Sequence, residues 1–505
     1  MEQTSSNIAN EQIETSRKLN DQEQIRMNKV DEIKSLGIDP FGGKYTITHY
    51  SKAIKDGYAN AAKEELEEKQ INVSIAGRIM TKRSKGKAGF MHLQDNDGQI
   101  QIYMKQDILP EIDYKLFDIC DIGDIVGIKG TVFKTNTGEI SVRAESYTHL
   151  TKALKPLPEK FHGISDEDTK FRKRYLDIIT NKEVKDIFYK KQIFWSTIRN
   201  YLIENDFLEV ETPILETSSG GAAATPFSTH HNALDIDVCL RISMGELWQK
   251  KLLVAGFDKT FEIGRQFRNE GMSSEHLQDY TQMEFYWAYA DFEMGMEFCK
   301  EMYRRVTKAV MGSSTFTSRG FEIDMDADWK IYDFETIIEE KMGINIYKAT
   351  ESEIMNKLEE VNIEFDPNIG YWRLVDVLWK AVRKDLAGPG FLVGQPVQLN
   401  PLPKRLDNDP RKVAQMQIVL AGSEMGNGYT ELNNPIDLEE RFKEQRTMSE
   451  AGDTEAHDHD ETFIEALRYG MPPAFGFGVS ERFFSVMMNR PIRECVLFPL
   501  MKPKG

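Results

Sequence analysis

Two polar runs set in largely apolar sequence decide how this chain folds: FRNEG at residues 267–271 and YTQMEFY at residues 280–286. They lie in the segments 260–268 and 280–289, whose residue pattern predicts two strands joined by a short loop. Strands that follow one another through short turns, without alternating with helices, are typical of an antiparallel sheet. We therefore predict an α+β fold for the C-terminal part of the chain, with helices flanking an antiparallel β-sheet.

Further elements extend this part of the chain in both directions. Strands are predicted at 207–213, 236–243, 415–422, 427–432, 474–480 and 483–489. Apolar residues at three- and four-residue spacing predict a helix over 183–204, begun by a capping box from Thr180 to Glu183. Asn205 and Asp206, which tolerate a left-handed turn, end that helix. Pro213 cannot donate to a central ladder and indicates the edge of a sheet or an interface.

Four polar clusters interrupt the apolar segments, at residues 243–248, 267–286, 423–433 and 472–482. Glu284 and Tyr286 share one strand face, and Tyr429 and Glu431 share a face with Glu424 if no bulge intervenes. Several carboxylates on one core face are costly unless a cation lies between them. The clusters therefore predict a cation-binding pocket, and a surface network of ion pairs is the alternative.

Two other patterns carry weaker signals. The glycines of GFG at 476–478 do not follow a strand and open a helix, as a dinucleotide-binding loop requires. His457 and His459 lie in an acidic stretch that favours a solvated loop capping the next helix over a metal site.

Residues 71–145 alternate with a period of two and contain turn sequences at 86–89, 96–98 and 136–138. Five short strands with one alternating face fit a small closed barrel of the OB type, a fold that often binds single-stranded nucleic acid. Phe90, His92 and Gln94 are expected to project together from one strand beside a basic hairpin at 78–87. The alternative is that this hairpin and face are plain solvated surface.

Composition bounds the class of protein. The 505 residues carry a net charge of −17, so a nucleic-acid partner would have to meet a local basic patch. No apolar run approaches the roughly 20 residues that span a bilayer, and no secretory signal is visible, so we expect a soluble, cytosolic protein. The four cysteines form no C-x-x-C pair, which excludes a Cys-rich zinc site and favours buried, reduced thiols.

The motifs resemble those of class II aminoacyl-tRNA synthetases. FLEVETP at 207–213 resembles motif 1, residues 267–284 resemble motif 2, and GFGVSER at 476–482 resembles motif 3. More narrowly, the runs GNGYTELN (426–433), EFYWAYAD (284–291), LKPLPEKFHG (154–163) and RECVLFP (493–499) are similar to those of bacterial lysyl-tRNA synthetases. The resemblance covers residues 70–300 and 385–505 with the motifs in the family's order. It divides the chain into an N-terminal extension (1–65), an anticodon-binding OB domain (66–150), a linker (151–180) and a catalytic domain (181–505) with a helical insertion at about 324–390.

The resemblance implies that ATP and lysine form lysyl-adenylate, and that lysine then passes to the 3′ end of tRNA(Lys). It places Arg268 and Arg482 in catalysis. It assigns to ATP the residues Arg268, Glu270, His276, Tyr280, Glu424, Gly478 and Arg482. It assigns to lysine the residues Gly221, Glu246, Glu284, Tyr286, Asn427, Tyr429 and Glu431. It assigns to Mg²⁺ the residue Glu424, and to the anticodon the residues Arg78, Phe90, Gln94 and Glu139. It also implies a homodimer with the helix 183–204 and the motif 1 strand at the interface.

The choice of lysine has independent support in residue chemistry. An aspartate or asparagine pocket would need a cation or amide donors, whereas Glu246, Glu284 and Glu431 converge here. Carboxylates in a partly dry pocket select ammonium groups, because an uncharged rival would leave them unpaired at about 1–3 kcal/mol per group.

The sequence also departs from the family pattern. Motif 3 is one residue shorter than usual, Ser243 to Glu246 is one residue longer, and Leu277 replaces a common Asn. Gln417, seven residues before Glu424, stands where a second magnesium-binding Glu is usual. We therefore expect fewer or weaker secondary metal sites, but still at least one Mg²⁺ with ATP. Two rival functions stay open: a related enzyme that lysylates a protein, which would resemble the catalytic domain alone, and a catalytically inactive RNA-binding relative.

Overall fold

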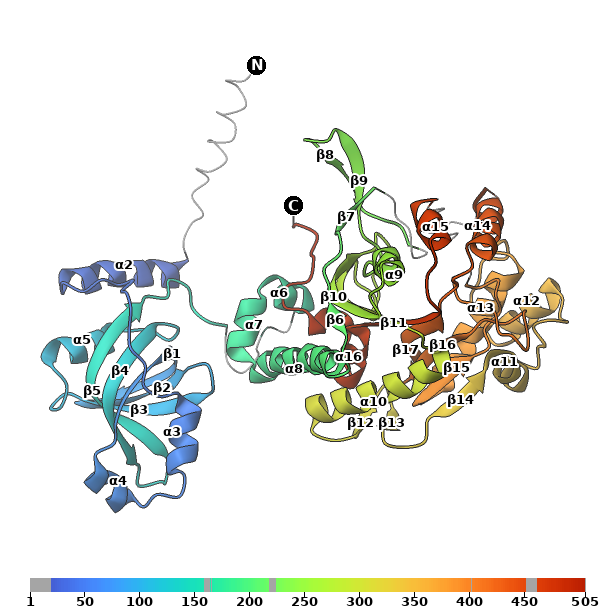
Figure 1. Ribbon diagram of the computed structural model, residues 1–505. Helices are drawn as coiled ribbons and strands as arrows, with labels where there is room; N and C mark the ends of the chain where they lie inside the picture. Colours follow the sequence, from blue (N-terminus) through green and yellow to red (C-terminus); the bar gives the residue numbers. More distant parts are fainter. Residues whose placement is uncertain are drawn as a thin grey trace. The chain divides into compact units, whose positions relative to one another are not determined.

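The computed structural model describes residues 20–158, 164, 166–217, 224–400, 402–450 and 461–504, with only the backbone at 442 and 444–450. The chain divides into two units, residues 1–166 and 167–505, and each is described by itself (Figure 1). His457 and His459, considered above as a metal site, lie outside the described residues.

The first unit is the predicted closed β-barrel. Its strands, β1 (Asn72–Lys85), β2 (Ala88–Gln94), β3 (Gln99–Lys105), β4 (Ile125–Lys134) and β5 (Ile140–Thr151), follow the order β1-β2-β3-β5-β4. Alternate residues face the interior: along β2, Met91 and Leu93 are buried and Phe90 is exposed. The helices of this unit are α2 (Asp21–Ser35), α3 (Ser51–Tyr58), α4 (Lys63–Lys69) and α5 (Glu111–Ile119). The period of two in the sequence therefore identified the barrel correctly.

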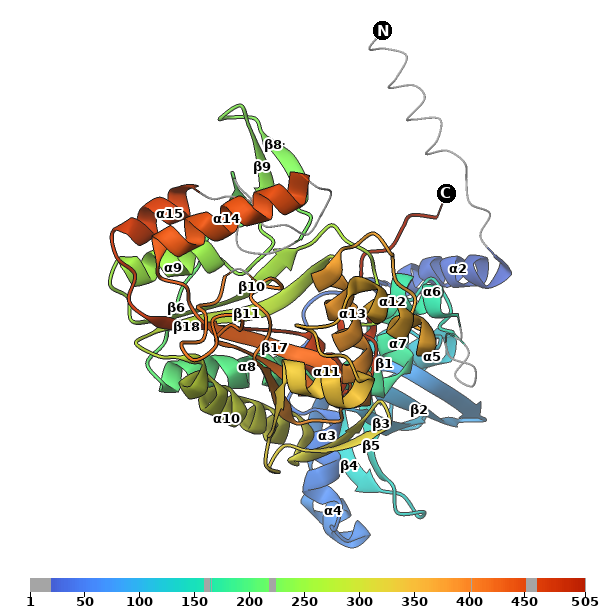
Figure 2. The same ribbon diagram turned by 90° about the vertical axis from the view of Figure 1, so that its right-hand side faces the viewer.

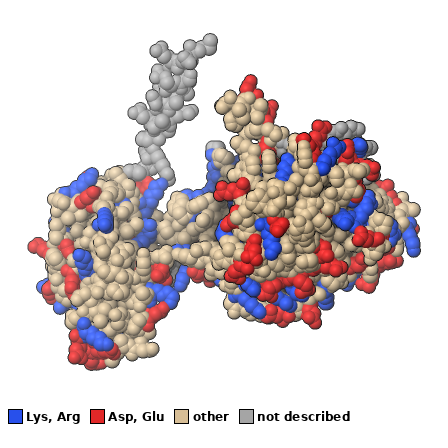
Figure 3. Space-filling model, viewed as in Figure 1, with Lys and Arg blue, Asp and Glu red and all other residues tan. Residues whose placement is uncertain are grey.

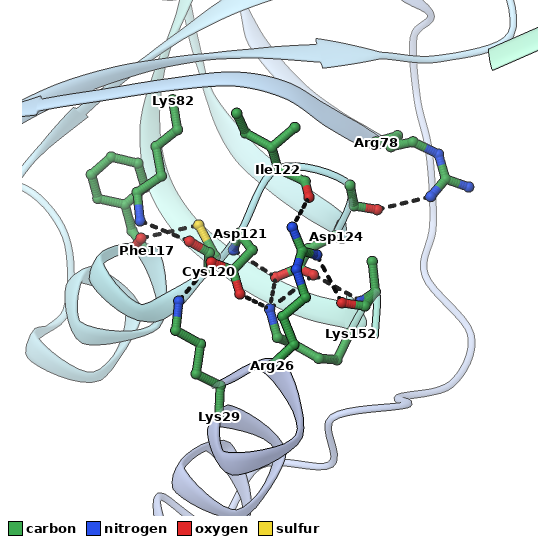
Figure 4. Close-up of polar contacts among 12 residues, drawn as sticks. Arg26, Lys29, Arg78, Lys82, Phe117, Cys120, Asp121, Ile122, Asp124 and Lys152 are labelled. Carbon is green, nitrogen blue, oxygen red and sulfur yellow. Dashed lines mark hydrogen bonds and ion pairs between the residues drawn. The ribbon is translucent and has the colours of Figure 1, made fainter. Parts of the chain in front are cut away.

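A buried cluster of charges fixes the loop between α5 and β4 (Figure 4). The Nζ of Lys152 lies 2.8 Å from Asp124 Oδ2 and 2.6 Å from Asp121 Oδ2, and the side chains of Lys152 and Asp124 are fully buried. Arg26 of α2 donates to the carbonyl oxygens of Ile122 and Ala153, at 3.0 and 2.9 Å. The loop is thus held from two sides, by the end of β5 and by α2.

The second unit is built on a mainly antiparallel sheet. Within the described residues its strand order is β14 (Lys330–Asp333), β15 (Gly390–Val393), β16 (Gln415–Leu420), β17 (Ser423–Thr430), β18 (Ala474–Ser480), β11 (Asp279–Ala288), β10 (Lys259–Phe267) and β6 (Leu208–Glu209). Neighbours pair antiparallel except at the two edges, where β14 with β15 and β6 with β10 are parallel. The predicted motif 1 strand is the edge strand β6, as Pro213 indicated. The predicted strand at 236–243 is β9 (Ile236–Leu240), which belongs instead to a small sheet with β7 (Leu215–Glu216) and β8 (Ser228–His231).

Helices cover the sheet on both faces (Figure 2). The helices α8 (Lys182–Glu204) and α10 (Phe292–Met311) pack on the apolar face, where Phe194, Tyr303, Phe285 and Phe477 share one core. On the opposite face lie α9 (Glu246–Val254), α14 (Pro435–Glu450) and α15 (Glu461–Arg468). Because the strands alternate, the face away from the aromatic core is the one that carries the polar residues of the four clusters.

Two sequence predictions for this unit are wrong. The segment 483–489, predicted as a strand, forms the helix α16 (Arg482–Met487). Residues 483–487 are all buried, and an apolar run without periodicity does not distinguish a strand from a helix. The cap of α8 is Asn181, whose side chain accepts the N–H of Glu183, and not Thr180.

The segment 324–390 folds around its own apolar core. It contains the helices α11 (Phe334–Met342), α12 (Glu351–Glu360) and α13 (Tyr371–Val382), but also β14, which joins the main sheet. The C-terminal turn of α13 therefore lies close to β16 and β17, where Trp379 of that helix contacts Glu424.

The remaining surface features are unexceptional. Acidic and basic side chains are interspersed over the visible face of each unit (Figure 3). All four cysteines are buried and none forms a disulfide, as predicted. None of the helices in the described part of the chain is long and apolar enough to cross a membrane.

The buried Lys152 provides a test of the barrel. Lys152→Met leaves Asp124 without its buried counterion, and we expect a loss of about 3–5 kcal/mol in the stability of the first unit. All six tryptophans, from Trp195 to Trp379, lie in the second unit, so tryptophan fluorescence does not report on the barrel. The variant should shift a denaturant transition seen by far-UV circular dichroism and not by fluorescence. An unshifted barrel transition would contradict the role of this pair, and Asp124→Asn added to Lys152→Met should recover part of the loss.

Candidate active site

The polar face of the main sheet is hollowed by a cavity of about 470 Å³. Its lining comes from β11, β17 and β18, from the first residues of α9 and α16, and from the loop between β10 and β11. It brings together every described residue that the resemblance placed at ATP, lysine or metal: Arg268, Glu270, His276, Tyr280, Glu424, Gly478, Arg482, Glu246, Glu284, Tyr286, Asn427, Tyr429, Glu431 and Gln417. Gly221, also predicted at lysine, lies outside the described residues.

Two glycines of β18 keep the floor of the cavity open. Gly478 pairs with Glu284 of β11 on one side and with Asn427 of β17 on the other, so it lies in the middle of the polar face. A Cβ at Gly476 would lie 2.2 Å from Glu431 Oε1. The two glycines of GFG therefore leave room for the cavity between two polar strands. This need for space explains why glycine occurs at both positions, although the sequence does not form a phosphate-binding loop.

A β-bulge directs Glu424 into the cavity. Ile418 of β16 pairs with Gly426 and Val419 pairs with Glu424, so Met425 is the extra residue on β17. A bulge exchanges the faces on which the residues before and after it lie. The expectation that Glu424 reaches this face only without a bulge is therefore wrong: the bulge places it there.

One end of the cavity is acidic. Glu246 at the start of α9, Glu284 on β11 and Glu431 just after β17 are all buried. Lys250, one turn along α9, is buried as well, and its Nζ lies 2.7 Å from Glu246 Oε1 and 2.7 Å from Glu431 Oε2. Tyr429 donates its hydroxyl to the same oxygen of Glu246, at 2.7 Å. Lys250 thus ties two of the three carboxylates together, while Glu431 Oε1 has no hydrogen-bond partner within the described residues.

Glu284 is held by hydrogen bonds from three directions. It accepts the hydroxyl of Tyr286 at 3.0 Å, the backbone N–H of Met244 at 3.1 Å and the side-chain amide of Gln282 at 2.6 Å. Met244 belongs to the one-residue extension of the family pattern, and Gly245 beside it takes up a left-handed conformation with φ +64° before α9 begins. The longer sequence therefore brings a backbone donor to a pocket carboxylate.

Burial makes these carboxylates unusually basic. Burial, reinforced by Glu246, raises the pKa of Glu284 to about 7. Burial also raises the pKa of Glu431 to about 8, although Lys250 acts in the opposite direction. Burial disfavours the charge of Lys250, but Glu246 and Glu431 more than offset this and raise its pKa above the usual value. Near neutral pH the acidic end therefore retains protons that a bound cation would displace.

The other end of the cavity is basic. Arg482, the first residue of α16, has a side chain that is 22% exposed, and its Nη2 lies 2.6 Å from His276 Nε2. Arg268 follows β10 and donates its Nε to the carbonyl oxygen of Ile242 at 3.1 Å. Burial and Arg482 lower the pKa of His276, which favours a neutral imidazole. Glu270 lies at the exposed rim.

Two of the carboxylates at the basic end, Glu275 and Glu424, are paired with arginines. Glu275 lies 2.6 Å from Arg319 Nη1. Glu424 Oε1 lies 2.7 Å from Arg383 Nη1 and accepts the indole N–H of Trp379 at 2.7 Å. The amide of Gln417 donates to Glu424 Oε2 at 3.3 Å.

Sequence reasoning missed the cations that bind these carboxylates. Lys250 had a readable signal, since it follows Glu246 at the i,i+4 spacing of a helical ion pair. Arg319 and Arg383 lie far along the chain from Glu275 and Glu424, so no local pattern points to them.

The residues predicted at the anticodon lie on one face of the barrel in the first unit: Arg78, Phe90, Gln94 and Glu139. The register of β1 and β2 places Arg78 opposite Gln94. Phe90 is 39% exposed and its ring centroid lies 5.0 Å from that of Tyr103. Glu139 Oε1 lies 3.7 Å from a ring nitrogen of His92 on β2. An exposed aromatic ring beside polar groups suits the stacking of an unpaired base.

The basic hairpin beside this face is only partly free. Arg78 donates to the carbonyl oxygen of Gly123 at 2.8 Å, and Lys82 donates to the carbonyl oxygens of residues 118 and 120 (Figure 4). Arg83, Lys85 and Lys87 are exposed at the tip. The loop described in the fold thus anchors Arg78, and the tip retains basic groups for a phosphate backbone.

Comparison with known proteins agrees with both units. The family described as tRNA synthetases class II (D, K and N) matches residues 166–502, and the OB-fold nucleic acid binding domain matches residues 73–150. The lysine–tRNA ligase of Staphylococcus epidermidis is 43% identical over 495 residues, covering 97% of this chain and 100% of the relative. The chain therefore belongs to the class II tRNA synthetases, in the family that contains this lysine–tRNA ligase. The ligases of Bacillus cytotoxicus and Bacillus cereus are 44% and 43% identical, over 96% of this chain and 98% of each relative. The match to lysine–tRNA ligases thus extends through the barrel and the catalytic unit, as the motifs predicted.

Glu284 provides a test of the acidic end. Its carboxyl group has an ordinary pKa of 4.5 and a pKa of about 7 in the folded protein, so between these values the folded state holds a proton that the unfolded state has lost. Its contribution to stability is therefore complete below pH 4.5 and is lost as the pH rises through about 7. Glu284→Gln should remove this loss and stabilise the ligand-free protein above pH 8, by up to about 3 kcal/mol, but not at pH 4.5.

Urea unfolding followed by tryptophan fluorescence at several pH values measures this difference. The exposed Glu297→Gln serves as the matched control, because Glu297 is 72% exposed in its pair with Lys300. Parallel pH profiles for wild type and Glu284→Gln would refute the buried, proton-retaining carboxyl group.

Proposed function

We propose that this chain is a lysine–tRNA ligase that activates L-lysine with ATP and transfers it to the 3′ end of tRNA(Lys). The observation that carries the proposal is the cavity itself, with three buried carboxylates at one end and arginines at the other. An amino acid with a cationic side chain fits the first end and a polyphosphate fits the second. Family membership over nearly the full length of the chain supports the same reaction.

Lysine is selected by charge in a buried pocket. Its ammonium groups pair with carboxylates whose protons they displace, and Glu284 and the unpartnered oxygen of Glu431 are available for this. A neutral amino acid would leave these groups unpaired, at about 1–3 kcal/mol per group. Asn427, Tyr286 and Tyr429 line the same end. Aspartate would meet repulsion there.

The chemistry requires no dedicated side-chain base. The carboxylate of lysine attacks the α-phosphorus of ATP, the bond to the bridging oxygen breaks, and pyrophosphate leaves. Arg268 contacts the α-phosphate and the attacking carboxylate, and Arg482 neutralises the γ-phosphate end. Glu270 and His276 contact the nucleotide, Tyr280 stacks on adenine, and Gly478 allows close approach of the backbone. Catalysis then consists of positioning and charge neutralisation.

The donor set fits one magnesium ion better than a cluster. Glu424 offers a carboxylate and Gln417 a neutral carbonyl oxygen, whereas Glu275 is paired with Arg319. Within the described residues, no group of three or more His, Cys, Asp or Glu side chains is arranged to hold a metal. We propose that Mg²⁺ reaches the site with ATP and is held by Glu424 and phosphate oxygens, with water completing its shell. Bound there, it would neutralise phosphate charge and orient the pyrophosphate.

The barrel supplies tRNA recognition. Phe90 stacks on an anticodon base, Arg78, Gln94 and Glu139 read base edges, and the basic tip of the hairpin contacts phosphates. Since charged tRNA is used by ribosomes, we expect the enzyme to act in the cytoplasm.

We also propose a homodimer formed through α8 and the β6 edge. Their outer surface carries large apolar side chains: Tyr189 is 45% exposed, Ile193 40% and Leu208 49%. Burying these residues against a second copy removes apolar area from water.

The function is tested with the full-length protein. It should exchange pyrophosphate into ATP with lysine, but not with aspartate or asparagine, and should charge a tRNA with a UUU anticodon. Exchange without charging would favour the protein-lysylating alternative, and absence of exchange would favour an inactive relative. Arg268→Ala should abolish exchange and leave the oligomeric state unchanged. Phe90→Ala should preserve exchange and raise the KM for tRNA about tenfold or more, the effect expected for one stacked base.

The dimer is tested by light scattering. Ile193→Asp places a charge in the proposed interface and should convert the dimer to a monomer. Tyr469→Asp alters an apolar residue that is 81% exposed on another part of the unit and serves as the control. A wild-type mass of one chain, or a dimer that persists in Ile193→Asp, would exclude this interface.

A further inference from the structure

The arginine that binds Glu424 suggests an additional role at the phosphate end of the cavity. Arg383 follows α13 at the start of the short 3-10 helix η1 (Arg383–Asp385). Its contact with Glu424 runs from Nη1 to Oε1 at 2.7 Å. Trp379, one turn earlier on α13, donates to the same oxygen. Two residues of one helix end therefore approach the carboxylate proposed to bind magnesium.

The charges around Glu424 differ from those of a metal cluster. Gln417 adds a neutral amide, and its N–H group points at Glu424 Oε2 at 3.3 Å. Glu275 is occupied by Arg319 and Ser423, at 2.6 and 2.9 Å. A carboxylate already paired with a guanidinium has less negative charge to offer to divalent cations. Arg319 and Arg383 therefore lie where additional metal ions would need negatively charged ligands.

Arg383 does not itself line the cavity, but it contacts Glu424, which does. Its side chain is 19% exposed. A guanidinium has five N–H donors, and the contact with Glu424 uses one of its nitrogens, Nη1. Burial lowers the pKa of the neighbouring Arg482, and Arg383 adds to that effect, as expected for two cations at one end of the cavity.

We propose that Arg383 is a phosphate-binding residue that supplies to the β- and γ-phosphates of ATP part of the positive charge that magnesium ions otherwise supply. The inference rests on the proposed function, since it concerns the ATP of that reaction. When ATP binds, the guanidinium keeps or exchanges its contact with Glu424 and directs its remaining N–H donors to phosphate oxygens, a geometry that suits its planar fork. The enzyme accordingly needs fewer metal ions per ATP.

The test separates nucleotide binding from catalysis. Isothermal titration calorimetry measures the binding of ATP to the full chain in EDTA, where no divalent cation is present. Wild type should bind ATP under these conditions, and Arg383→Gln should bind it about tenfold or more weakly, the factor expected for losing a charge-assisted hydrogen bond to phosphate. Arg383→Lys, which keeps the charge without the fork, should lie between them. AMP, which lacks the β- and γ-phosphates, should bind both wild type and Arg383→Gln equally.

A matched control removes a different positive charge from the same helix. Lys380 lies 2.7 Å from Asp376 on the exposed side of α13, and Lys380→Gln should bind ATP like wild type. Gln417→Glu changes the site in the opposite direction: it should weaken ATP binding in EDTA and lower the magnesium concentration needed for half-maximal pyrophosphate exchange.

Two results would overturn the proposal. If wild type and Arg383→Gln bind ATP equally well in EDTA, Arg383 only holds Glu424 in place and does not bind phosphate. If Arg383→Gln loses as much affinity for AMP as for ATP, the effect of Arg383 does not involve the β- and γ-phosphates. Neither measurement involves lysine or tRNA. Failure of the proposed function, seen as absence of lysine-dependent exchange, is therefore distinguishable from failure of this inference.

Discussion

The buried ammonium of Lys250, shared between Glu246 and Glu431, is the contact on which the acidic end of the cavity depends. Three carboxylates buried at one end of the cavity would repel one another strongly, and the single cation of Lys250 reduces that repulsion without removing the demand for a second cation. Both Glu246 and Lys250 come from the first turns of α9, so the left-handed Gly245 that starts this helix sets the position of both at once. The cavity is therefore preset for a cation, because the fold itself neutralises only part of the charge.

The cavity as a whole has opposite charges at its two ends. The acidic end contains Glu246, Glu284, Glu431 and Lys250, whose formal charge is −2 when all four are ionised and less negative near neutral pH, where burial retains protons. At the basic end, Arg268 and Arg482 line the cavity together with Glu270, Glu275 and Glu424. Arg319 and Arg383 pair with Glu275 and Glu424 from outside the lining, so the formal charge of the whole group is +1. The glycine floor of β18 separates them without adding side chains. This arrangement favours one orientation of an ammonium-bearing amino acid and a polyphosphate in the cavity, and such positioning lowers the entropy cost of bringing reacting atoms together.

Sequence reasoning reached the barrel, most strands of the antiparallel sheet and the described cavity residues of the family motifs, because each depends on local period or on a short motif. It did not reach what depends on register or on distant pairing. The bulge at Met425 decides the face of Glu424 and leaves no signature in a single sequence. The apolar run at 483–487 is buried throughout, so it lacks the periodicity that separates helix from strand. Arg383 contacts Glu424 only because α13 packs beside β16 and β17. This packing joins segments about 40 residues apart, so no local sequence pattern predicts it.

Each unit contains a buried lysine paired with a buried carboxylate, Lys152 with Asp124 and Lys250 with Glu431. The two pairs differ in how many hydrogen bonds the carboxylate accepts. In the barrel, Asp124 accepts Lys152 and two backbone N–H groups, so both of its oxygens have donors. In the catalytic unit, Glu431 is also buried against a lysine, yet its Oε1 has no hydrogen-bond partner within the described residues. A buried carboxylate whose oxygens are paired with a lysine and with backbone N–H groups stabilises the fold, whereas an unpaired carboxylate oxygen costs stability that a ligand can restore. The incomplete pairing at Glu431 therefore supports the binding role proposed for it, independently of the motif in which it lies.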